Sequence, residues 1–270
     1  MKVSNLRKWV NIQEWFGTIG AHCLNFFGEM GGITMIFWRA TAVFFATPLR
    51  VKDTVQQMYK IGVASLPLVS LTSLFTGMVL ALQSAYQLQI FSATQFTSDL
   101  VSLSIVRELG PVLTAMVVAG RVGASIAAEI GTMKVTEQID ALQSLATDPI
   151  QYLVVPRYIA AVVMLFLLTV YSDVIGVVGG YFVAIFKLDI SPYQYIHRAI
   201  DVLVLKDLWS GLMKALVFGI VISMVGCYHG FEAKGGAEGV GTATTKAVVT
   251  SMISIIAFDC LFTGMFYFMF

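Results

Sequence analysis

Long apolar runs, broken by few charges, dominate the pattern along the chain. Residues 61–98 contain no Lys, Arg, Asp or Glu. The first part of this stretch reads IGVASLPLVSLTSLFTGMVLAL, which has the roughly 20 residues that a helix needs to cross the hydrocarbon of a bilayer. Similar runs follow at about 100–119, 158–186, 208–227 and 247–270. The pattern predicts an all-α integral membrane protein with five transmembrane helices over residues 61–270.

Residues 1–60 follow a different pattern, in which apolar positions recur at helical spacing among polar ones. One apolar set is Leu6, Trp9, Val10, Phe16, Ile19, Cys23 and Phe27, and a second, around Arg39, is Ile33, Ile36, Phe37, Ala40, Val43 and Phe44. Such stripes are typical of amphipathic helices that lie in the membrane interface. We therefore predict a separate N-terminal region of interfacial helices. An alternative is that residues 33–49 form a re-entrant or spanning helix.

Basic residues predict the orientation in the membrane. Seven of them precede the first span, namely Lys2, Arg7, Lys8, Arg39, Arg50, Lys52 and Lys60, whereas residues 83–99 contain none. Because basic loops stay inside, the N-terminus is predicted to be cytoplasmic, and five spans then place the C-terminus on the outer side. The connection predicted to lie outside carries Lys187, Arg198 and Lys206, accompanied by Asp189, Asp201 and Asp207.

Composition narrows the class of protein further. The chain is 57% hydrophobic and 12% charged, with a net charge of +1, whereas soluble domains are about 25% charged. The near-zero net charge argues against a nucleic-acid partner. Three cysteines and three histidines lie far apart and predict neither a disulfide framework nor a metal site. No phosphate-binding loop and no nucleophile–base pair occur, so we expect no catalytic residues in this chain.

Charged residues inside the predicted spans are costly and indicate a functional site. Glu108 lies nine residues after Asp99, and Lys214 lies seven after Asp207, which places them at similar depths of about 13 and about 10 Å. We predict that Glu108 and Lys214 face a central cavity, with Arg107 nearby. They either pair with each other or contact a polar lipid headgroup; a purely structural ion pair is the alternative.

Neighbouring residues extend this predicted site. Pro111 lacks an amide hydrogen, so the carbonyl of Arg107 loses its helical partner and the helix should bend beside the charges. Phe91 and Leu109 are candidates to line a path for acyl chains, although a packing role suits Phe91 equally. Asp173 and Asp259 are expected to act as hydrogen-bonded contacts between helices.

Between the second and third spans lies a polar stretch, residues 124–147. Glu129, Lys134, Glu137 and Asp140 alternate there with apolar residues at helical spacing, and Asp148-Pro149 ends the run. We predict a short helix along the cytoplasmic face that docks a soluble partner. The simpler reading is a solvated connecting loop.

Three sequence blocks resemble a known family. They read RELGPVLTAMVVAGRVGASIAAEIGTMKVTEQIDAL, DPIQYLVVPR and GVGTATTKAVV, and together they are similar to the MlaE/YrbE permease family. The resemblance implies a homodimer of permeases in the bacterial inner membrane. It also implies a cytoplasmic ABC ATPase dimer, a periplasmic ring of MCE-domain subunits and phospholipid as cargo moved between inner and outer membranes. A small cytoplasmic accessory subunit is a further expected partner.

The resemblance also assigns roles to residues. The predicted docking segment becomes the coupling helix that seats in a groove of the ATPase, through Glu129, Gly131, Thr132, Met133, Lys134, Glu137, Gln138 and Asp140. The chain itself needs no cofactor, because ATP and Mg²⁺ bind to the ATPase. Import of sterols or other hydrophobic molecules is an alternative cargo. A secondary transporter with Glu108 and Asp173 as ion relays is a further alternative, although no inverted repeat supports it.

Overall fold

The structure is a computed structural model that describes residues 20, 24, 27–48 and 50–269. Almost all of the first predicted amphipathic helix lies outside these residues. The described part of the chain is helical and contains no strand, which confirms the all-α prediction. Five stretches in it are long and apolar enough to cross a membrane, as predicted: Val51–Gln89, Thr94–Val135, Ile150–Leu188, Leu205–Phe231 and Gly236–Phe268.

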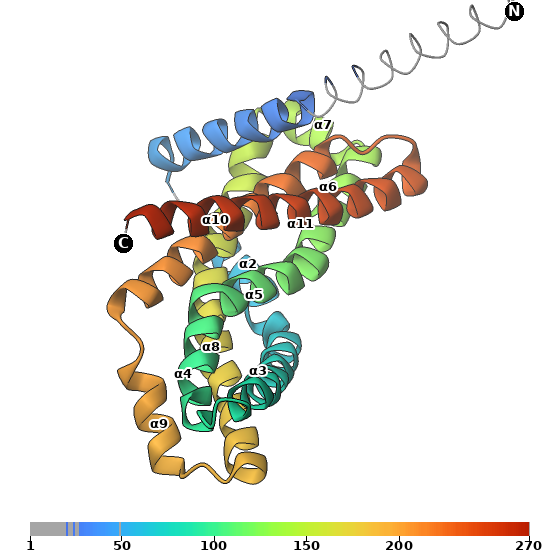
Figure 1. The fold of residues 1–270 in the computed structure, drawn as a ribbon. Coiled ribbons are helices and arrows are strands. Elements are labelled where there is room, and N and C mark those ends of the chain that lie inside the picture. Colours follow the sequence, from blue (N-terminus) through green and yellow to red (C-terminus); the bar gives the residue numbers. More distant parts are fainter. Residues whose placement is uncertain (1–19, 21–23, 25–26, 49, 270) are drawn as a thin grey trace, which may run out of the picture.

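The helices follow one another with short connections (Figure 1). A first helix covers residues 27–46. The others are α2 (Val51–Ile61), η1 (Val63–Ser65), α3 (Leu66–Gln89), η2 (Thr94–Phe96), α4 (Thr97–Ser104), η3 (Ile105–Leu109), α5 (Gly110–Val118), η4 (Ala119–Gly123), α6 (Ala124–Val135), α7 (Gln138–Ser144), η5 (Ile150–Val154), α8 (Val155–Leu188), α9 (Pro192–Asp201), α10 (Leu205–Phe231) and α11 (Gly236–Met269). The fifth helix begins at Gly236, before the predicted residue 247, because the polar turns around Glu238 and Lys246 continue the same helix.

The helix over residues 27–46 uses the apolar face that its sequence predicts. Ala40 is fully buried, and Ile33, Ile36, Phe37, Val43 and Phe44 pack against the main core. Trp38, on the opposite side, is exposed. This helix is not among the five candidate spans, so the spanning alternative for residues 33–49 is not supported.

The segment predicted as one helix over residues 124–147 is divided in the structure. Its first half, α6, continues the second span without a break, and α7 follows as a separate short helix. Glu137 lies between them with a φ of 60°, in the left-handed region. This conformation is unfavourable for a residue with a side chain, and it turns the chain so that α7 leaves the line of α6.

The tightest packing joins α3 to α8 through glycines. A Cβ atom on Gly77 would lie 1.8 Å from the carbonyl oxygen of Gly176, and one on Gly179 would lie 2.2 Å from that of Leu74. Small residues allow two membrane helices to bring their backbones together, which replaces the hydrophobic effect that lipid cannot supply. Gly176 and Gly180, four residues apart on α8, therefore both lie at this helix–helix contact.

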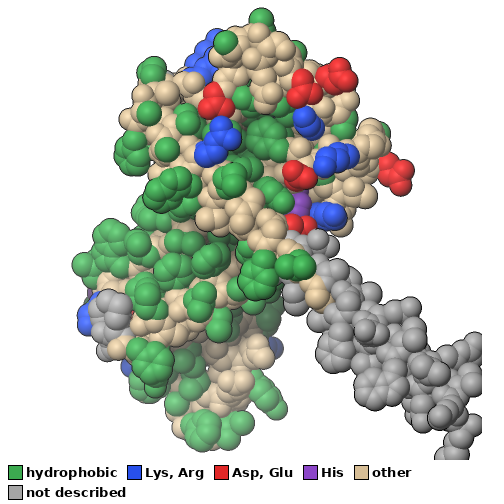
Figure 2. Space-filling view, turned by 90° about the horizontal axis from the view of Figure 1, so that it is seen from above, with side chains coloured by type: hydrophobic (Ala, Val, Ile, Leu, Met, Phe, Trp, Pro, Cys, Tyr) green, Lys and Arg blue, Asp and Glu red, His purple; other side chains and the backbone are tan. Residues whose placement is uncertain are grey.

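The two ends of the bundle differ in chemistry. The helix over residues 27–46 and α7 lie at one end, and α9 lies at the other (Figure 1). Seen from the first end, acidic and basic side chains gather over one part of the face, whereas hydrophobic side chains cover most of the rest (Figure 2). α10 packs against α6, α8 and α11, so it holds the polar end and the apolar bundle together.

The glycine contact gives a testable prediction. Gly77→Ala places a methyl group against the backbone of α8, and we expect it to lower the free energy of unfolding by about 1–3 kcal/mol through overpacking. Gly264→Ala is the matched control, because nothing lies within 4 Å of its Cβ position. Thermal unfolding in detergent measures both. Equal melting temperatures for the two variants would contradict the proposed packing.

Candidate functional site

A lysine buried within the spans lies at the centre of the site. The side chain of Lys214 on α10 is 1% exposed. Its Nζ lies 2.5 Å from Glu108 Oε2 on η3 and 2.7 Å from Thr263 Oγ1 on α11. Asp259 Oδ1, also on α11, forms an ion pair with it at 2.9 Å. An ammonium group removed from water is stable only when oxygen atoms replace its hydration, and η3 and α11 supply them.

The backbone around Pro111 supplies one more oxygen. η3 is a π-helical turn, in which the N–H of Gly110 donates to the carbonyl of Ile105. Because Pro111 has no N–H, the carbonyl of Arg107 cannot accept the usual helical hydrogen bond from residue 111. Lys214 Nζ donates to this carbonyl at 3.3 Å. The irregular turn expected from the proline therefore gives the buried ammonium a further ligand.

Arg107 points away from Lys214, toward the first turn of α10. Its Nε and Nη2 lie 2.7 and 2.6 Å from Asp207 Oδ1. Asp207 is buried, and its Oδ2 also accepts the N–H of Val204, which caps α10. The carboxylate of Asp207 thus caps the beginning of α10, the helix that carries Lys214, and also binds the guanidinium of Arg107.

The charged groups open on a cavity of about 700 Å³. Its lining comes from η3, from the beginning of α10 and from the second half of α11: Arg107, Glu108, Val204, Lys206, Asp207, Ser210, Lys214, Thr263, Phe266 and Tyr267. A mixed lining of charges and aromatic rings suits a molecule with a polar and an apolar part. The structure thus brings three of the predicted substrate-binding residues, Arg107, Glu108 and Lys214, to one cavity.

The other two predicted substrate-binding residues lie elsewhere. Leu109 lines a separate hollow of about 330 Å³ against α3, with Phe75 and Val79. Phe91, in the turn that follows α3, is 78% exposed. Neither contributes to the charged cavity, so their contact with acyl chains stays a prediction. Asp173 is buried against Gly110 and does not line the charged cavity either.

At the α7 end, two residues of the predicted coupling set face inward. Glu129 accepts hydrogen bonds from Lys60 at 3.0 Å and from Arg157 at 2.8 Å. It therefore ties α6 to α2 and α8. Gly131 packs against the α10–α11 turn, where a Cβ would lie 3.2 Å from Ala233. Glu129 and Gly131 therefore stabilise the packing of the helices at this end of the bundle.

The remaining coupling residues form or support an outer surface. Thr132, Glu137, Gln138 and Asp140 are exposed. Met133 packs against the core, and Lys134 forms an ion pair with Asp140 at 3.2 Å. This pair joins α6 to α7 across the left-handed turn. The exposed face therefore has a defined shape, although its contact with an ATPase stays a prediction.

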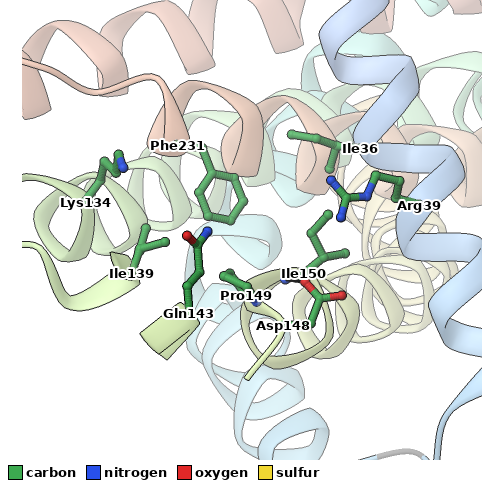
Figure 3. A pocket seen from close by; sticks show the side chains of 9 residues that line it. All are labelled: Ile36, Arg39, Lys134, Ile139, Gln143, Asp148, Pro149, Ile150 and Phe231. Carbon is green, nitrogen blue, oxygen red and sulfur yellow. Dashed lines mark hydrogen bonds between the residues drawn. The ribbon is translucent and has the colours of Figure 1, made fainter. Parts of the chain in front are cut away.

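A hollow of about 270 Å³ lies beside this surface. Side chains from the helix over residues 27–46, from α6, from α7, from the turn before α8 and from the end of α10 converge on it (Figure 3). They are Ile36, Arg39, Lys134, Ile139, Gln143, Asp148, Pro149, Ile150 and Phe231. Segments far apart in the sequence thus meet around α7, which fixes its position on the bundle.

Comparison with known proteins identifies the fold family. Residues 54–265 match the family model described as Permease MlaE. The chain belongs to the MlaE permease family. All of the residues that surround Lys214 lie within the matched range. In the part of the chain that the structure describes, no three His, Cys, Asp or Glu side chains are grouped to hold a metal ion.

Individual relatives extend the similarity beyond the family model. A probable ABC transporter permease protein of Rickettsia prowazekii is 47% identical over 92% of this chain and 96% of its own length. One from Synechocystis is 42% identical over 84% and 90%. The intermembrane phospholipid transport system permease protein MlaE of Haemophilus influenzae is 32% identical over 95% and 98%.

Three residues of this MlaE-family site were missing from the predicted set. Asp259 was expected to join helices, Asp207 served only to measure depth, and Thr263 had no predicted role. Asp259 and Thr263 are four residues apart, and therefore lie on one face of α11. A carboxylate and a hydroxyl at this spacing within a span could have signalled the site. Asp207 could not be assigned, because its partner Arg107 is 100 residues away in the sequence.

The Lys214 cluster predicts that removing its cation alone lowers the free energy of unfolding more than removing the cation together with its two carboxylates. Lys214→Met leaves Glu108 and Asp259 without their cation, and we expect a loss of about 3 kcal/mol in the free energy of unfolding. Adding Glu108→Gln and Asp259→Asn removes the unpaired charges and should restore part of the loss. Lys234→Met, at a side chain that is 82% exposed, is the control. Thermal unfolding in detergent compares the variants; a triple variant less stable than Lys214→Met would contradict the electrostatic explanation.

Proposed function

We propose that the chain is the permease subunit of an ABC transporter that moves phospholipid between the inner and outer membranes of a bacterium. The observation that carries the proposal is the buried Lys214 cluster and its cavity within the spans. A phospholipid headgroup loses hydration when it enters a membrane protein, and fixed charges can replace that hydration. The name of the Haemophilus influenzae relative, which refers to phospholipid transport, supports the same cargo.

The cavity is suited to both parts of a lipid. Charged and hydroxyl groups lie around Lys214, whereas Val204, Phe266 and Tyr267 present apolar surface to the same space. A headgroup can contact the first set while acyl chains contact the second. Two copies of the chain would enclose the lipid more fully, and the homodimer is part of this proposal.

The energy for transport comes, in this proposal, from a separate cytoplasmic ATPase that binds ATP and Mg²⁺. The exposed residues of α7 and of the turn before it form its docking surface. The N-terminus then lies in the cytoplasm and the C-terminus in the periplasm, where a ring of MCE-domain subunits receives or delivers the lipid. This chain contributes the membrane path and no hydrolysis.

A cavity-filling variant tests the transport path. Ser210 lines the cavity, and we expect Ser210→Trp to abolish ATP-driven transfer of a fluorescent phospholipid between vesicles, because the indole occupies the headgroup space. Ser210→Ala is the matched control and should transport at the wild-type rate. Both variants are assayed with the ATPase that copurifies with the chain. Wild-type transfer by Ser210→Trp would show that lipid does not pass through this cavity.

A charge reversal tests the docking surface. Glu137→Lys with Asp140→Lys should weaken retention of the ATPase on the immobilised chain by about tenfold or more, because two acidic contacts become repulsive. Asp201→Lys, on an exposed residue at the end of α9, is the control. Unchanged retention with intact transport would refute the assignment of this surface. Loss of retention by the control would indicate a general effect of charge.

A further inference from the structure

A second cavity, of about 590 Å³, lies between η3, α8, α9 and α10. It shares no lining residue with the charged cavity: Leu208 and Leu212 of α10 line this one, whereas Ser210 and Lys214 line the other. α9 lies at the end of the bundle opposite to α7 (Figure 1). A volume of this size is typical of a site for one small molecule, for which roughly 300–1,000 Å³ is usual.

The walls of this second cavity are almost wholly apolar. One side of α8 contributes four valines and α9 adds two isoleucines, namely Val170, Val174, Val177, Val178, Ile196 and Ile200. None of the residues that line the cavity is Lys, Arg or His. A phosphate group would find no counter-charge there to repay the cost of its removal from water. The cavity therefore does not suit a phospholipid headgroup.

One side chain of the lining is acidic. Asp173 of α8 lines the cavity and is only 7% exposed. Its Oδ1 lies against Gly110 and has no hydrogen-bond partner among the residues that the structure describes. The sequence predicted a hydrogen bond between helices for Asp173, and the structure places none at this atom. A buried carboxyl group that lacks a hydrogen bond is costly, so a molecule that donates one gains by binding beside it.

The donor that fits Asp173 is a hydroxyl group. An ammonium has three N–H donors, and the buried ammonium of Lys214 needs oxygen atoms from several groups around it. Besides Asp173, the lining side chains offer only the hydroxyls of Tyr181 and Tyr195. The hydroxyl of Tyr195 already donates to the carbonyl of Val177 at 3.3 Å. A hydroxyl on the bound molecule has one donor, which a single carboxyl oxygen satisfies.

We propose that this second cavity binds a lipid alcohol, an elongated apolar molecule with one hydroxyl group and no phosphate. The hydroxyl donates to the carboxyl group of Asp173, and the apolar body lies along the valines of α8 and against α9. Phe182 lies twelve residues after Val170 on the lining face, so the body has about 18 Å of wall along α8. This site is separate from the cavity of the proposed transport path.

Photolabelling of the full chain in nanodiscs tests the site. One probe is hexadecanol with a diazirine in its chain, and the other is the methyl ether of the same molecule, which lacks the O–H donor. Labelled peptides of α8 and α9 are counted by mass spectrometry. We expect the alcohol to label them about fivefold more than the ether, the ratio that one hydrogen bond supplies. Asp173→Leu should remove this preference, whereas Asp173→Asn keeps an acceptor oxygen and should retain it.

A cavity-filling variant gives a second test. Val174 lines the cavity and is 58% exposed, so Val174→Trp should lower labelling by the alcohol to the level of the ether. Val249→Trp, on an exposed residue of α11 outside the cavity, is the matched control and should keep the preference. Equal labelling by the two probes in the wild-type chain, unchanged labelling in Val174→Trp, or a preference that persists in Asp173→Leu overturns the proposal. If Asp173→Leu does not fold, the wild-type comparison and Val174→Trp decide it.

Discussion

The burial of one ammonium group within a membrane-spanning bundle constrains much of the structure. Lys214 is removed from water, so oxygen atoms from its neighbours must replace its hydration. They come from η3, where Glu108 and the carbonyl of Arg107 lie, and from α11, where Asp259 and Thr263 lie. Each of these helices must therefore keep a set depth and rotation relative to α10. The cavity lies where these helices meet, so the need to surround Lys214 with oxygen atoms accounts for both the site and the packing of these helices.

Close backbone contact supplies the rest of the rigidity. Apolar side chains gain little from leaving lipid for a protein interior, so helices in a membrane depend on close packing and polar contacts. The glycines of α3 and α8 provide the first, and the ion pairs at Lys214 and Glu129 provide the second. The π-helical turn η3 contributes to both the close packing and the ion pairs. It carries Glu108, and it contacts α10 at Gly211, where a Cβ would lie 2.2 Å from the carbonyl oxygen of Val106.

The sequence predicts the membrane spans and part of the charged site, and it does so for different physical reasons. Spans depend on local hydrophobicity, which a run of twenty residues displays without reference to any partner. The pairing of Glu108 with Lys214 could be foreseen from equal depth alone. Glu129 could not be placed, because an acidic residue on an amphipathic segment looks exposed until Lys60 and Arg157 are brought to it. Leu109 is next to the charges in sequence, yet it lines a hollow against α3, and Phe91 lies in an exposed turn.

The sequence by itself determined that the chain enters a membrane, how many helices cross it and which residues carry charge there, since these follow from composition and local period. Beyond the pairing of Glu108 with Lys214, the tertiary structure alone decided which charges meet. Asp207 joined Arg107, and Asp259 with Thr263 joined Lys214, across about 50 to 100 residues of sequence. The rotation of each helix sets these contacts, and the rotation is fixed by packing against neighbours that no local pattern describes.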